Sequence, residues 1–174
     1  MPVRLFSANE NIHLADTHLQ SYCCSLVRGI LEEALADRLD FLDGVIFPHT
    51  CDSFQRLSDI WRLNIKGPFH LDVVLPVKLD TPSALRDALE KFKNDLGGKL
   101  GREITNAMLA DSIRTYNKIR RLIGKLYELR CENPQIISGA DFHAVIKAAM
   151  IMDKNDFLEA LSQIITQLEK DGAQ

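Results

Sequence analysis

Short apolar runs in the first half of the chain predict β-strands. Residues 3–6 and 45–47 are brief runs of the kind that fill a buried parallel strand, and Pro48 stops the second of them. Residues 69–75 supply a third such run. The pattern therefore predicts three strands within residues 1–80.

Helical spacing of apolar residues separates these runs. Asp16 is a plausible N-cap for a first helix that reaches about Ala36. Thr50 can cap a second helix, and the pair Gly67-Pro68 ends it. Strands and helices that alternate through short connections are typical of a parallel sheet, with the site expected beyond the carboxyl ends of the strands. Residues 1–80 thus predict an α/β fold with a small Rossmann-like parallel sheet and flanking helices.

Residues 81–174 show helical spacing only. The four predicted helices run from Thr81-Pro82 to Gly97-Gly98, from a Thr105 cap to Asn133-Pro134, from a capping box formed by Ser138 and Asp141, and from about Asn155 to Glu169. Helices without intervening strands do not extend a sheet. We therefore expect a helical arm or bundle over residues 81–174 that packs on the first half.

Composition narrows the class of protein. The chain has 174 residues, which favours one compact domain, and no apolar run approaches the roughly 20 residues of a membrane helix. The net charge of −3 and scattered histidines leave no basic surface for nucleic acid. The N-terminus lacks the pattern of a signal peptide, so we expect a cytoplasmic protein whose four cysteines are free thiols or metal ligands.

The loop of residues 47–53 is the first candidate site. It follows a predicted buried strand, opens a helix, and contains His49, Cys51 and Asp52. A cysteine in the first turn of a helix lies near the positive end of the helix dipole, which favours the thiolate that a metal ligand or nucleophile needs. A half-buried cysteine without chemical function fits the loop equally well. A pair of Cys51 and His49 acting as nucleophile and base is disfavoured, because such pairs usually come from distant segments.

The other cysteines and the histidines give weaker signals. Cys23 and Cys24 lie inside the first predicted helix, where neighbouring side chains point about 100° apart, so both bind one ion only with distortion. Cys23 belongs to the apolar face, which leaves Cys24 as the better candidate. Cys131 is expected to be structural, and no Cys-x-x-Cys spacing supports a zinc ribbon or a ferredoxin-type cluster. For the five histidines we expect structural roles, since none has a carboxylate partner at a favourable spacing.

Several segments together resemble one protein family. They are Pro2-Val-Arg-Leu5, Cys24-Ser-Leu-Val-Arg28, Leu42-Asp-Gly-Val-Ile-Phe-Pro-His-Thr-Cys-Asp52, Asp59-Ile-Trp61 and Leu75-Pro-Val-Lys78, with later support from residues 104–120 and 137–141. In this order they resemble the 2-hydroxyacyl-CoA dehydratase and benzoyl-CoA reductase subunit family over nearly the whole chain. A Cys-Asp pair after an Asp-Gly strand, with an upstream Cys-x-x-x-Arg, is harder to meet by chance than any one segment.

The resemblance implies an oxygen-sensitive iron–sulfur subunit of an anaerobic enzyme that handles CoA thioesters. In this family three cysteines hold a [4Fe–4S] cluster, and a separate ATP-hydrolysing iron–sulfur activator injects single electrons. In the dehydratases the electron converts the thioester carbonyl to a ketyl radical, the 2-hydroxyl group is lost, and the electron is recycled; in the reductases electrons reduce the aromatic ring. Cys51 and Cys24 match two of the family's cluster cysteines, with Cys23 as the alternative to Cys24.

One departure from the family pattern affects the expected function. The third cluster cysteine of the family belongs to a second α/β domain, which these 174 residues do not contain. We therefore expect residues 1–80 and 81–174 to form together one domain of a longer two-lobed subunit, and the isolated chain to be inactive. A second subunit of the same family, the activator and an acyl-CoA substrate are the implied partners. The alternative is a non-catalytic Rossmann-like module that docks another subunit while its cysteines stay free.

Overall fold

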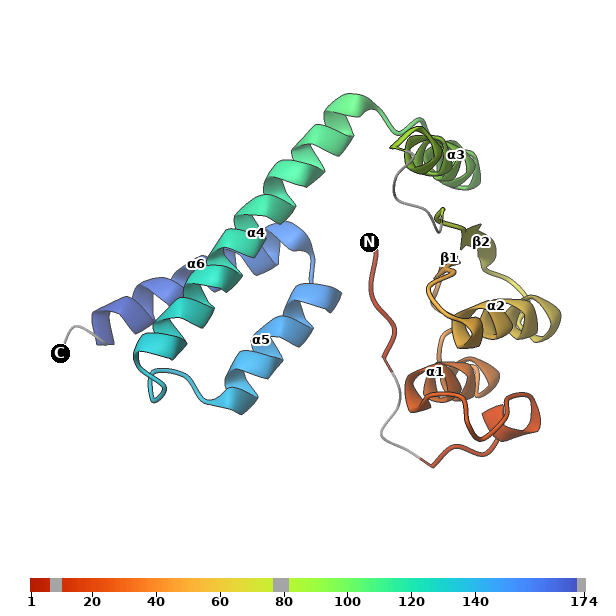
Figure 1. The fold of residues 1–174 in the computed structure, drawn as a ribbon, viewed down its shortest axis with the longest axis horizontal. Coiled ribbons are helices and arrows are strands. Elements are labelled where there is room, and N and C mark those ends of the chain that lie inside the picture. Colours follow the sequence, from red (N-terminus) through yellow and green to blue (C-terminus); the bar gives the residue numbers. More distant parts are fainter. Residues whose placement is uncertain (7–10, 77–81, 172–174) are drawn as a thin grey trace. The chain divides into compact units, whose positions relative to one another are not determined.

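The computed structural model describes residues 1–6, 11–76 and 82–171. Packing divides the chain into two bodies, one made of Leu5–Ile104 and the other of Thr105 onward together with Met1–Arg4. The strands and α1–α3 belong to the first body, and α4–α6 belong to the second (Figure 1). Among the described helices, none has the length and apolar character needed to cross a membrane.

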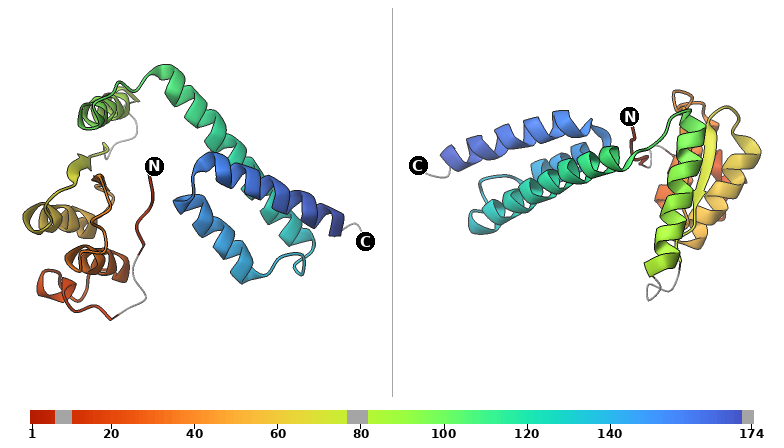
Figure 2. Two further views of the ribbon diagram at one scale, coloured as in Figure 1. Left: turned by 180° about the vertical axis from the view of Figure 1, so that it is seen from behind. Right: turned by 90° about the horizontal axis from the view of Figure 1, so that it is seen from above.

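The first body is an α/β unit. Its described elements are a 3₁₀ turn η1 (Ala15–Thr17), α1 (Ser25–Leu35), β1 (Gly44–Pro48), α2 (Asp52–Asn64), β2 (Phe69–Val73) and α3 (Pro82–Leu100). The strands β1 and β2 pair in parallel, with Gly44 opposite Phe69 and Pro48 opposite Val73. Helix α2 connects the strands and packs against β1 and α1, while α3 packs beside β2 (Figure 2). The α/β class with a small parallel sheet, predicted from the sequence, is confirmed.

The core of this body lies between the strands and the helices α1 and α2. Val45 and Phe47 alternate with exposed Ile46 along β1, so their side chains share the face that the helices cover. The Phe47 ring meets the edge of Trp61 on α2, with ring centroids 5.5 Å apart. Helix α1 adds Val27, Ile30, Leu31 and Ala34, whose spacing puts them on one side of the helix. This packing fixes the point at which β1 ends and α2 begins.

A buried carboxylate holds the segment that precedes α1. Glu32 is only 6% exposed, and its Oε2 accepts the backbone N–H of His13 at 3.1 Å and of Ala15 at 2.8 Å. The helix predicted to begin at Asp16 is therefore wrong in its first part. The segment forms η1 and then turns, because a side chain binds its N–H groups while Ala15 and Leu19 fill the core, and α1 begins only at Ser25.

The second body is a set of three helices. They are α4 (Asn106–Glu132), α5 (Gly139–Ile151) and α6 (Lys154–Asp171), and α4 packs mainly on α6. Its buried residues are Ile119, Leu126, Ile137, Phe157, Leu161 and Ile165. The two predicted caps are confirmed: Thr105 Oγ1 accepts the N–H of Met108 at 3.3 Å, and Ser138 Oγ accepts the N–H of Asp141 at 3.1 Å.

The strand predicted at residues 3–6 is wrong. These residues form no regular element, and the N–H of Arg4 donates to the carbonyl oxygen of Met150, near the end of α5, at 3.3 Å. A short apolar run can pack as an extended segment without a neighbouring strand, and periodicity alone does not distinguish the two.

The helix end predicted at Gly97-Gly98 is also wrong, by one turn. Helix α3 continues to Leu100 and ends where Gly101 adopts a left-handed φ of +63°. The N–H of Arg102 then donates to the carbonyl of Gly97 at 3.0 Å, and that of Gly101 to Gly98 at 3.4 Å, which is a Schellman cap. A Cβ at position 97 would lie 2.8 Å from the Arg102 carbonyl oxygen, so the glycine there serves the cap.

We predict that Gly44→Ala weakens the first body. An added Cβ would lie 2.3 Å from the Phe69 ring, which covers Gly44 in the parallel pair, so the ring must move and lose its packing. We expect the free energy of unfolding in urea to fall by about 1–3 kcal/mol. The matched control is Gly98→Ala inside α3, where the added Cβ meets nothing within 4 Å and should stabilise by about 0.5–1 kcal/mol. Equal effects of the two substitutions would contradict the packing argument.

We also predict that Glu32→Ala loosens the segment before α1. The buried N–H of Ala15 and the part-buried N–H of His13 would lose their acceptor, and the buried group left unsatisfied costs about 1–3 kcal/mol. Urea unfolding measures the loss of stability, and proteolysis within residues 11–24 reports the loosening. Glu33→Ala is the control, because Glu33 makes a surface ion pair with Arg38 whose loss costs at most about 1 kcal/mol.

Candidate functional site

Cys51 lies where β1 gives way to α2. The N–H of His49 donates to the carbonyl of Val73 at 2.9 Å, which extends the strand pairing by one residue, and the N–H of Thr50 then donates to Pro48 O at 2.8 Å as the chain turns. Cys51 is the N-cap of α2, with extended backbone angles, an exposed side chain and no capping hydrogen bond from its sulfur. The cap predicted at Thr50 is thus wrong by one residue.

Cys24 occupies the same position on the neighbouring helix. It is the N-cap of α1, is exposed, and likewise makes no side-chain capping bond. Cys23 instead lies in the core of the first body and is 8% exposed. The sequence predicted Cys23 and Cys24 inside the first helix, but both precede α1. The chain turns before Ser25, and the N–H of Cys23 donates to the carbonyl oxygen of Gln20 in that turn.

Cys24 and Cys51 stand at the starts of two adjacent helices. Helix α2 starts directly beyond the carboxyl end of β1, and Cys51 is its N-cap. Helix α1 ends at Leu35 and is followed by β1 after residues 36–43. Because α1 packs on α2 and shares its core, the two N-cap cysteines belong to neighbouring helices of one body.

The described residues do not form a complete metal site. Within residues 1–6, 11–76 and 82–171, no three His, Cys, Asp or Glu side chains form a group that could hold a metal ion. Cys131 is exposed near the end of α4, in the second body. The chemistry of Cys24 and Cys51 nevertheless suits a soft metal, because both are free thiols without competing hydrogen bonds from a cap.

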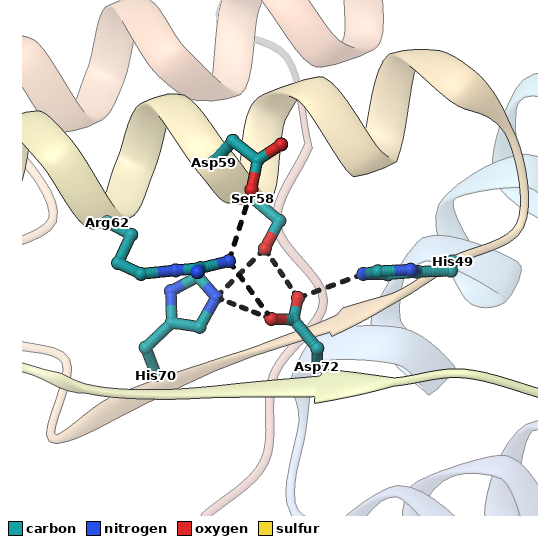
Figure 3. Close-up of polar contacts among 6 residues, drawn as sticks. All are labelled: His49, Ser58, Asp59, Arg62, His70 and Asp72. Carbon is teal, nitrogen blue, oxygen red and sulfur yellow. Dashed lines mark hydrogen bonds and ion pairs between the residues drawn. The ribbon is translucent and has the colours of Figure 1, made fainter.

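A polar network lies beside the turn that leads to Cys51. Asp72 on β2 is its centre: the carboxylate accepts a short hydrogen bond from Ser58 Oγ and contacts His49 Nε2 at 3.0 Å (Figure 3). Its second oxygen is 3.3 Å from the Arg62 guanidinium and 3.4 Å from His70 Nε2. Ser58 and Arg62 come from α2, so one carboxylate joins the second strand, the helix and the turn.

The hydrogen bonds of Ser58 indicate which ring nitrogen of His70 carries a proton. Ser58 donates its one proton to Asp72, so it accepts from His70 Nε2 at 2.8 Å, and the other ring nitrogen of His70 is buried without a hydrogen-bond partner. The His70 ring also stacks on Phe47, with centroids 4.9 Å apart. Burial by itself raises the pKa of Asp72, but the hydrogen bonds from Ser58 and His49 and the nearby His70 outweigh it and leave that pKa below its usual value.

Residue spacing gave no histidine a carboxylate partner, whereas in the structure His49 and His70 both contact Asp72. Residue spacing missed the network because its members come from a turn, a helix and a strand. Strand alternation could have found part of it: His70 and Asp72 are two residues apart on one strand and therefore share a face.

Sequence comparisons relate the whole chain to one protein family. The family model for the 2-hydroxyglutaryl-CoA dehydratase D-component matches residues 1–174. The chain is 32% identical to a benzoyl-CoA reductase subunit of Thauera aromatica over 168 residues, which is 95% of this chain and 43% of the relative. It is 29% identical to the beta subunit of (R)-2-hydroxyglutaryl-CoA dehydratase of Acidaminococcus fermentans over 152 residues, or 85% of this chain and 40% of that relative.

A third relative is the beta subunit of (R)-phenyllactyl-CoA dehydratase of Clostridium sporogenes, 25% identical over 171 residues, which is 97% of this chain and 46% of the relative. The chain thus spans less than half the length of the curated relatives it matches. A match of the family model to every residue is decisive for membership. The chain belongs to the 2-hydroxyglutaryl-CoA dehydratase D-component family, which the segments around Cys24 and Cys51 indicated.

Proposed function

We propose that this chain is part of an iron–sulfur subunit of a 2-hydroxyacyl-CoA dehydratase or a benzoyl-CoA reductase. In this proposal Cys24 and Cys51 are two of the ligands of a [4Fe–4S] cluster. The observation that carries the proposal is that both cysteines, in a member of this family, are exposed N-caps of adjacent helices whose sulfurs make no capping bond.

A cysteine in this position leaves the N-terminus of its helix open. The usual N-cap residues bind the first free N–H groups of the helix with a side-chain oxygen, and here no side chain does so at α1 or α2. Those N–H groups and the positive end of the helix dipole stabilise an anionic ligand set such as thiolates bound to iron. Exposed Cys24 meets this requirement, whereas Cys23 would have to leave the core to do so.

Two thiolates are too few to hold the cluster by themselves. A [4Fe–4S] centre is ordinarily held by several cysteines, so we propose that the remaining attachment comes from residues outside residues 1–174. When bound, the cluster would supply single electrons for chemistry on a CoA thioester. The residues of this chain would fix its place and shield one side of it with the β1–α2 core. We expect the 174 residues alone to show neither dehydration nor ring reduction.

The proposed partners follow from the same assignment. Two relatives are named as beta subunits of dehydratases and one as a subunit of a reductase, so we propose that this chain also assembles with a second subunit of its family. An ATP-hydrolysing iron–sulfur activator and an acyl-CoA substrate complete the proposed system. Cysteines that stay unpaired suit a reducing compartment, and we propose the cytoplasm.

We predict that Cys24→Ala and Cys51→Ala each abolish cluster binding in the full-length subunit. After anaerobic reconstitution with iron and sulfide, iron per chain and charge-transfer absorbance should fall at least fivefold in each variant, because loss of one ligand leaves an incomplete site. Circular dichroism and urea unfolding should match the unsubstituted subunit, since both side chains are exposed.

Two further variants serve as controls. Cys131→Ala removes an exposed thiol from the second body and should retain full iron content. Cys23→Ser tests the alternative ligand, and it should keep the cluster in the fraction of the protein that folds. Unchanged iron in both Cys24→Ala and Cys51→Ala would refute the ligand assignment and favour a subunit-interaction module with free cysteines.

A further inference from the structure

Cys51 lies between two attachments to the same carboxylate. Two residues before it, His49 contacts Asp72 through Nε2 at 3.0 Å. Along α2, Ser58 lies two turns after Cys51 and Arg62 three turns after it, and they contact the two oxygens of that carboxylate (Figure 3). The segment from His49 to Arg62 therefore contacts Asp72 on both sides of Cys51. The position of the Cys51 sulfur depends on these two contacts.

The Cys51 side chain has no hydrogen bond of its own to hold it, since it is exposed and makes no capping bond. Its backbone carbonyl accepts the N–H of Gln55 at 3.2 Å, which joins Cys51 to α2. On the other side of Cys51, the backbone bonds are one from His49 N–H to Val73 and one from Thr50 N–H to Pro48. A span of two residues reaches at most about 7 Å, so a displacement of His49 is carried directly to Cys51.

Several donors hold the Asp72 carboxylate. Asp72 pairs across the sheet with Phe47, which is buried, and its carboxylate accepts a hydrogen bond from Ser58, which is 1% exposed. His70 Nε2 donates in turn to the hydroxyl of Ser58. A carboxylate with this many donors rarely changes rotamer, because each donor would lose its acceptor. The network thus connects a buried serine of α2 to the turn before Cys51.

We propose that Asp72, acting through His49, is a positioning residue for Cys51. Neither side chain needs to touch the cluster. The pair holds the turn in the one conformation that starts α2 at Cys51 and keeps the sulfur in a fixed place relative to the sheet. We call the contact between His49 and Asp72 the tether; it exists without metal. Only the effect of the tether on bound iron rests on the proposed function.

The first experiment measures the tether in the metal-free full-length subunit. Hydrogen exchange of the amides in residues 49–55 should become at least tenfold faster in His49→Ala, because the ring that joins the turn to Asp72 is gone. His49→Gln keeps an N–H donor of similar reach and should return exchange to within twofold of the original. Asp59→Asn is the matched control: it removes the other partner of Arg62 and leaves Asp72 intact, so exchange should not change.

The second experiment measures the effect on iron in the reconstituted subunit. Release of iron to a chelator should be at least fivefold faster in His49→Ala, with an altered electron paramagnetic resonance spectrum of the reduced cluster, and His49→Gln should restore both. Unchanged exchange in His49→Ala would overturn the tether, and faster exchange with unchanged iron release and spectrum would overturn its action on Cys51. If Cys51→Ala binds iron normally, the proposed function fails. The hydrogen-exchange result for His49→Ala still shows whether the tether exists.

Discussion

The carboxylate of Asp72 is the contact on which the arrangement of the candidate site depends. It receives groups from the turn after β1, from α2 and from its own strand, and so joins three parts of the chain. Apolar packing between Phe47 and Trp61 sets the distance between sheet and helix, but it is not directional. The charged hydrogen bonds add direction, and so they determine how the turn before Cys51 leaves the sheet.

Cysteine at the N-caps of α1 and α2 lowers the stability of the helix ends and leaves a thiol available for chemistry. An N-cap serine or aspartate stabilises a helix by about 1 kcal/mol, and the second body uses such caps at Thr105 and Ser138. The first body has cysteine at the corresponding places of α1 and α2 and lacks the capping bonds. Helix ends that are left open in this way bind anions through their backbone N–H groups, which is consistent with a thiolate-bound metal.

Much of the fold could be predicted from the sequence, because the deciding patterns are local. The run at residues 45–47, the spacing of Leu57 and Trp61, and the caps at Thr105 and Ser138 each act within a few residues of themselves. The family resemblance was likewise visible in the segments around Cys24 and Cys51, and membership is confirmed. Cys24 and Cys51 as cluster ligands stay a prediction.

The errors arose where a distant residue decides the local structure. Glu32 binds the N–H groups of His13 and Ala15, so the predicted first helix starts nine residues later, and the cysteines become caps instead of interior residues. Helix α3 passes through Gly97-Gly98 because the Gly101 cap lies one turn further on. Most of the Asp72 network escaped notice because His49, Ser58 and Arg62 lie 10 to 23 residues from Asp72 along the chain.

The lowered pKa of Asp72 has a consequence for how the subunit would respond to acid. Because this pKa is lower in the folded chain than in the unfolded chain, the carboxylate stabilises the fold above the unfolded value and loses its effect only as the pH falls through the folded value. The contacts of Asp72 with Ser58 and His49 should therefore persist until the pH falls below the usual range of an aspartate.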